Sequence, residues 1–255
     1  MLVLGNRHRF IVLGSVMKRK YKLERPSAKS NIPDPSKYAE GGFDPEILGT
    51  SKSANGLNRI FIEALCLDWE TAYAIPKGEI NTSPDADLKE RYYFLAERCT
   101  WKGTDARNIW AFGGKGNSNV LVNLCKSIDN LDRVKDAIIA GFQQAVKQSP
   151  VTGLPIVNTR FNIVDMKLAE NAADFGDDQM TTLGLRGVYA AFMASTPRLQ
   201  EAIYEDDTFI GWDNIGSARF PFDSSTRAGK LAAELRQKNG LSGDPPNLAT
   251  YMDKL

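Results

Sequence analysis

The chain has 255 residues, 42% of them hydrophobic, which is enough to bury a sizeable core in one large domain or two small ones. Its 32 Lys and Arg residues balance 31 Asp and Glu residues, so the overall charge gives no argument for nucleic-acid binding. Three scattered cysteines are too few for a disulfide framework, and no apolar run approaches the length of a membrane span. We therefore expect a cytoplasmic protein with reduced thiols and no membrane partner.

The N-terminal part differs from the rest in composition. Residues 1–23 carry six basic side chains and no acidic one, and residues 26–50 are rich in Pro and Gly. A basic start favours a flexible arm that touches RNA, while the lack of acids is also a property of organellar targeting segments. We expect a basic arm and a Pro/Gly linker over residues 1–45, followed by one folded domain over residues 46–255, with its first structured residue near Ile47.

The elements at the start of this domain are predicted from periodicity. Alternation of apolar residues predicts a strand over residues 59–66. Apolar residues at helical spacing, preceded by a start signal at Pro84 and Asp85, predict a helix over residues 88–99. Short strands are predicted over residues 108–112 and 119–124, with the glycine-rich stretch GGKGNSN as the turn between them.

The second half of the chain gives the strongest pattern. Residues 132–148 place their apolar side chains on one face and their polar ones on the other, which predicts an amphipathic helix. Alternation predicts a long strand over residues 159–168, and two further helices are expected over residues 180–194 and 226–238. The mixed order of strands and helices indicates a layered α+β domain.

The sequence offers little for catalysis. It contains no phosphate-binding loop of the form G-x-x-x-x-G-K-[ST], and its single histidine, His8, lies in the basic arm, away from any nucleophile. The acidic residues Asp174, Asp177 and Asp178 are of the type that holds a hard cation, but no further ligand run lies nearby, so a solvated loop is the preferred interpretation. We expect no catalytic residue, metal, cofactor or small-molecule substrate.

Several dense segments occur in one order along the chain. They are SKSANGLNRIFIEA from residue 51, FLAERCTWKGTDARNIWAFG from residue 94, DRVKDAIIAGFQQAVK from residue 132, RFNIVDMKLAENA from residue 160 and AAFMASTPRLQEAIY from residue 190. In order and spacing they resemble the fourth domain of elongation factor two, the ribosomal translocase of eukaryotes and archaea in the elongation factor G/two family. The segment over residues 221–255 resembles that family's C-terminal helix and tail.

The resemblance implies a fold and a place of action. The family's fourth domain is similar to the second domain of ribosomal protein S5, a layered sheet with helices packed on one face, closed here by the C-terminal helix. Two loops at its tip enter the decoding site, or A site, of the small ribosomal subunit. The GTPase, second, third and most of the fifth domain of the family have no counterpart in this sequence, so the resemblance implies a module without GTPase activity.

The two tip loops match the family only in part. In the first loop, residues 51–59, four residues match and Ala54 and Leu57 depart; the matching residues are Lys52, Asn55, Asn58 and Arg59. In the second loop, residues 170–179, Gly176 and Gln179 match. Asp174 stands where the family carries a histidine modified to diphthamide, and Phe175 stands where an arginine follows it. A carboxylate in place of a cation opposes contact with phosphates.

The resemblance therefore implies a monomeric, ribosome-binding module that contacts ribosomal RNA and tRNA on the small subunit. Its contact candidates are Lys52, Asn55, Asn58, Arg59 and Gln179. The alternatives are that these residues form an ordinary solvated polar loop, and that the chain is a degenerate or truncated elongation factor two remnant with no independent function.

Overall fold

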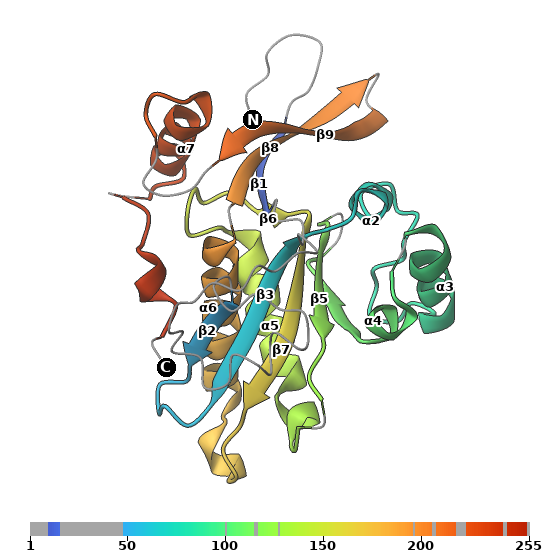
Figure 1. The fold of residues 1–255 in the computed structure, drawn as a ribbon, viewed down its shortest axis with the longest axis vertical. Helices are drawn as coiled ribbons and strands as arrows, with labels where there is room; N and C mark the ends of the chain where they lie inside the picture. The colour runs from blue at the N-terminus through green and yellow to red at the C-terminus, as the bar shows by residue number, and fades with distance from the viewer. Residues whose placement is uncertain are drawn as a thin grey trace, which may run out of the picture.

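The structure is a computed structural model, shown in Figure 1, and it describes residues 10–15, 48–99, 101–114, 117–126, 128–195, 197–205, 208–217, 223–241 and 244–253. The expectations for residues 1–9 and 16–45, including that for His8, lie outside these ranges. Within the predicted arm, the described segment Phe10–Ser15 forms a β-strand, β1, rather than a flexible arm. The domain division at residue 45 remains a prediction.

The main sheet has five strands in the order β2-β3-β7-β5-β4. These are β2 (Leu48–Lys52), β3 (Arg59–Cys66), β7 (Thr159–Lys167), β5 (Asn119–Asn123) and β4 (Ile109–Phe112). Neighbouring strands are antiparallel except for the parallel pair β5–β7. Four of these strands confirm the sequence prediction to within one residue at each end. The fifth, β2, was missed, because its first three residues fall in the Pro- and Gly-rich stretch over residues 26–50.

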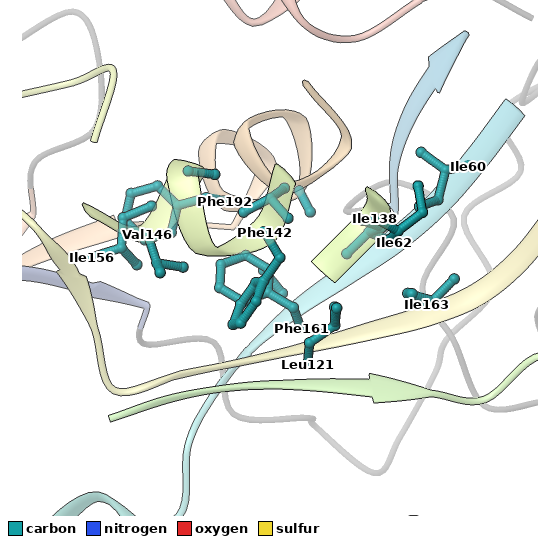
Figure 2. Packing of buried hydrophobic residues seen from close by; sticks show 14 of the residues in the cluster. Ile60, Ile62, Leu121, Ile138, Phe142, Val146, Ile156, Phe161, Ile163 and Phe192 are labelled. Carbon is teal, nitrogen blue, oxygen red and sulfur yellow. The ribbon is translucent and has the colours of Figure 1, made fainter. Parts of the chain in front are cut away.

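Two long helices cover one face of this sheet, and both were predicted (Figure 1). Helix α5 spans Leu131–Lys147, and helix α6 spans Asp177–Ala194, three residues longer at its start than expected. The core between them and the sheet contains Phe142 of α5 and Phe161 of β7, whose rings meet edge to face at 5.8 Å (Figure 2). This core fixes the ends of β3, β7 and α6 relative to one another.

The opposite face of the sheet is covered near its β5–β4 edge by three short helices. They are α2 (Trp69–Ala74), α3 (Leu88–Arg98) and α4 (Gly103–Arg107), and α3 confirms the helix predicted over residues 88–99. Because side chains alternate along β5, Leu121 joins the core under α5 and α6, while Val120 and Val122 join the second core under the short helices. The expected packing of helices on one face of the sheet therefore holds for α5 and α6, whereas α2, α3 and α4 cover part of the other face.

A second sheet lies beyond the first, with four strands in the order β6-β1-β8-β9. Its other strands are β6 (Ile156–Val157), β8 (Pro197–Glu205) and β9 (Thr208–Ser217). Helix α7 (Arg227–Lys238) confirms the predicted C-terminal helix, and three of its residues, Ala228, Ala232 and Leu235, belong to the main core. The C-terminal helix therefore closes the domain, and the chain ends in a short 3-10 turn, η3 (Leu248–Thr250).

Candidate functional site

Two loops that are more than a hundred residues apart meet at one end of the main sheet. The turn between β2 and β3, residues 53–58, lies against the loop after β7, residues 168–176, and we call these two segments the tip. The Asn58 side chain donates from Nδ2 to the main-chain oxygen of Asp174 at 2.8 Å and accepts at Oδ1 from the Ala169 N–H at 2.9 Å. Asn55 donates to the same Asp174 oxygen at 3.0 Å. The two expected tip loops are thus joined by three hydrogen bonds.

The two asparagines differ in exposure. Asn58 is 0% exposed, and its amide is fully engaged inside the protein. It therefore positions the second loop from within and offers no surface to another molecule, which differs from the expected contact role. Asn55 is exposed, and its Oδ1 accepts from the Ser53 hydroxyl at 2.6 Å, which orders the turn. Asn55 keeps an exposed side chain at the apex of the tip.

The second loop and the first residues of α6 present an acidic surface. Glu170, Asp177 and Asp178 are exposed, and Asp174 is half-buried. Phe175 turns inward instead and joins the main core at 7% exposure, with the Arg133 guanidinium 5.7 Å from its ring centroid. The residue standing at the family's arginine position is therefore a core residue, and it anchors the loop to α5.

A row of cations crosses the end of the sheet. Lys52 of β2 is directly opposite Arg59 of β3, and Arg59 is directly opposite Lys167 of β7. Residues opposite each other on antiparallel strands project to the same face. That face is the one away from α5 and α6, because Ile60, next to Arg59, belongs to the core under those helices. We call Lys52, Arg59 and Lys167 the basic row.

Sequence reasoning found two members of the basic row and missed the third. The strand that contains Lys167 was predicted, but its register against β3 was not, and only the register brings Lys167 beside Arg59. The signal available in the sequence was a lysine next to the last residue of the predicted strand, three positions before the second tip loop.

A groove of about 710 Å³ opens between the first tip loop, the start of α6 and the end of the C-terminal tail. It brings together the expected residues Lys52 and Gln179, and it adds Arg186 and Asp253, which the sequence did not single out. The remaining lining residues are Ser53, Ala54, Gly56, Asp178, Thr182 and Leu183. We call this space the tip groove.

The tail is held at the tip groove by several contacts. The Asp253 N–H donates to the Thr50 oxygen at 2.9 Å, and the Ser51 hydroxyl donates to the Tyr251 oxygen at 2.6 Å. The Tyr251 ring meets the Tyr189 ring edge to face at 5.1 Å, and burial raises the pKa of the Tyr251 hydroxyl. These contacts lay the tail along β2, where they cover the edge of the sheet.

Among the residues that the structure describes, no group of three or more His, Cys, Asp or Glu side chains is placed to hold a metal ion. In the same part of the chain, no helix combines the length and the apolar character needed to cross a membrane.

The chain was compared with models of known protein families. The family model described as elongation factor G, domain IV, matches residues 80–196. The match covers α3 to α6, the strands β4, β5 and β7, and the second loop of the tip. This part of the chain is therefore similar to domain IV of a translation elongation factor, and it has the expected α+β fold.

Proposed function

Proceeding from the elongation factor G domain IV at residues 80–196, we propose that this protein is a ribosome-binding module of the elongation factor two type. It acts in the cytoplasm as a monomer and places its tip at the decoding site of the small subunit, without hydrolysing GTP. The observation that carries the proposal is the joined tip, in which Asn58 and Asn55 tie the two loops to one carbonyl oxygen. A preorganised two-loop tip is what insertion into a narrow RNA site requires.

The basic row supports contact with phosphates. Like charges directly opposite one another on neighbouring strands destabilise a sheet, so the pair Arg59 and Lys167 opposes the stability of the isolated domain. An anionic partner such as an RNA backbone removes this repulsion and releases counterions at the same time. Asn55 then serves as a polar contact at the apex of the tip, and Gln179 serves as one in the tip groove.

A second candidate function is favoured by the acidic loop. Glu170, Asp177 and Asp178 are exposed, and their carboxylates repel the phosphates of RNA. This surface supports the alternative that the chain is a remnant whose fold persists while ribosome contact is lost. On the proposed function, the basic row contacts RNA phosphates, and the exposed carboxylates of Glu170, Asp177 and Asp178 do not.

The test is cosedimentation of the purified full chain with ribosomes through sucrose gradients at stepped salt concentrations. The wild type is expected to travel with ribosomes at physiological salt, and the Arg59→Glu, Lys167→Glu double variant is expected to stay at the top. The matched control is Lys89→Glu, Lys230→Glu, which reverses two exposed cations on α3 and α7, away from the tip. Wild-type protein that stays free at every salt concentration supports the remnant instead.

A further inference from the structure

One carboxylate of the tail lies among donors in the tip groove. The Oδ2 atom of Asp253 accepts from the main-chain N–H of Lys52 at 2.8 Å and from Nη2 of Arg186 at 3.0 Å. A backbone N–H together with a guanidinium is a donor set that proteins use for phosphate oxygens. The tail therefore places the Asp253 carboxylate at a position where the oxygen of another anion could accept the same hydrogen bonds.

We propose that the Lys52 N–H and the Arg186 guanidinium form a binding site for an RNA backbone phosphate, which Asp253 occupies in the free protein. The choice of RNA as the ligand rests on the proposed function. The inference adds to that function a phosphate subsite and the segment that covers it. RNA that places a phosphate at this site displaces the tail from the tip groove. RNA that does not reach the site leaves the tail in place and binds more weakly.

Arg186 has donor capacity that the tail does not use. Its Nε atom is buried and makes no hydrogen bond within the described structure, while Nη2 alone meets Asp253. Arginine binds phosphate through two parallel N–H···O bonds, and a phosphate offers more acceptor oxygens than the single Oδ2 that is engaged here. The exchange of carboxylate for phosphate therefore increases the number of satisfied donors.

The contact that covers the site is suited to exchange. The side chains of Arg186 and Asp253 are each 32% exposed, and an ion pair open to water contributes little to stability. With Asp253 removed, Arg186 remains as a cation of the tip groove beside the acid Asp178, and Lys52 offers its main-chain N–H there. Removal of the Asp253 carboxylate takes one negative charge out of the groove, which favours an anionic ligand.

The test uses fluorescence anisotropy of a labelled ten-nucleotide oligouridine RNA with the full chain. Asp253→Asn is expected to tighten binding by about tenfold, the change that corresponds to losing one competing charge-assisted hydrogen bond. Adding Arg186→Gln to Asp253→Asn is expected to return the affinity to the wild-type value or below. The matched control is Asp178→Asn, which makes the same change in charge in the same groove without touching the tail and is expected to shift affinity by less than about twofold.

A second measurement reports displacement of the tail directly. In the wild type, the Asp253 amide proton is bonded to the Thr50 oxygen, so its hydrogen exchange is expected to accelerate when RNA saturates the protein. Unchanged exchange at saturation, or equal tightening by Asp178→Asn and Asp253→Asn, overturns the inference. So does RNA binding that is undetectable in every variant.

The outcome separates this inference from the proposed function. Wild type that cosediments with ribosomes through Arg59 and Lys167, together with an Asp253→Asn variant of unchanged RNA affinity, rejects the phosphate site and keeps the ribosome module. An Asp253→Asn variant that binds RNA more tightly through Arg186, together with no cosedimentation of any variant, keeps the site and rejects the ribosome module.

Discussion

The side-chain amide of Asn58 donates a hydrogen bond to the main-chain oxygen of Asp174 at 2.8 Å, and so joins two loops separated by 116 positions in the chain. Asp174 stands where the resembled family carries its modified histidine, yet the part of Asp174 used here belongs to the backbone. The path of the second loop is therefore fixed without regard to the side chain at position 174. The shape of the tip can persist after its surface chemistry has changed.

The first prediction concerns this joint. Asn58→Ala leaves the Ala169 N–H without its acceptor and removes one donor from the Asp174 oxygen, so the free energy of unfolding is expected to fall by about 1–3 kcal/mol. Asn55→Ala removes an exposed donor to the same oxygen and is expected to change the free energy of unfolding by at most about 0.5 kcal/mol. Urea unfolding measures both, and equal effects of the two variants contradict the assignment of Asn58 as the residue that closes the tip.

The second prediction concerns the cost of the basic row. Lys167→Gln removes a charge directly opposite Arg59, so the isolated protein is expected to gain about 0.2–1 kcal/mol in free energy of unfolding while its ribosome binding weakens. The same change in an Arg59→Gln background is expected to give no gain, because the repulsion is already absent. Denaturant titration of the four proteins in this cycle measures the coupling. A gain of the same size in both backgrounds assigns the effect to strand propensity instead.

The sequence predicted the elements whose patterns are long. The helix around Phe142 and the strands around Ile62 and Phe161 each repeat their apolar positions several times, so periodicity located them. Helices α2 and α4, with six and five residues, are shorter than two helical turns and give no readable period. Strand β2 was hidden because its Gly49 lies against Ala191 of α6, and a glycine in that position reads as a loop from sequence alone.

The candidate site was predicted less completely than the fold, and for a different reason. The resemblance identified residues of both tip loops, but the roles of individual side chains depend on register and burial. Asn58 is polar and follows a turn, so sequence reasoning placed it on the surface, whereas it is fully buried. Arg186 and Asp253 are 67 positions apart and become neighbours only through the docking of the tail, which no local pattern records.

The third prediction concerns the contact between the two long helices. A Cβ atom added at Gly141 of α5 meets the Thr181 main-chain oxygen of α6 well inside van der Waals contact. Gly141→Ala is therefore expected to lower the free energy of unfolding by about 1–3 kcal/mol, although alanine has the higher helix propensity by about 1 kcal/mol. Gln144→Ala, on the exposed face of the same helix, is the control and is expected to change stability by less than about 0.5 kcal/mol. Thermal and urea unfolding measure both variants, and a stabilised Gly141→Ala protein shows that the helices separate without penalty.

The last prediction concerns alkaline pH and the residues that support the tail. Burial, and then the neighbouring Tyr251, raise the pKa of Tyr189 to about 12, and its hydroxyl donates to the Gln148 oxygen at 2.7 Å. In the unfolded chain a tyrosine loses its proton near pH 10, so below about pH 10 the hydroxyl is protonated in both states and its contribution is fully present. Between about pH 10 and 12 the unfolded state binds fewer protons than the folded state, so stability falls as pH rises.

Tyr189→Phe removes this proton and the hydrogen bond together. The variant is expected to be less stable than the wild type at neutral pH, and the difference is expected to shrink between about pH 10 and 12 as the wild type loses its contribution. Urea unfolding of both proteins across this range measures the difference. A stability difference that stays constant with pH shows that the Tyr189 hydroxyl titrates alike in the folded and unfolded states. The hydrogen bond to Gln148 then does not raise the proton affinity of the hydroxyl in the folded protein.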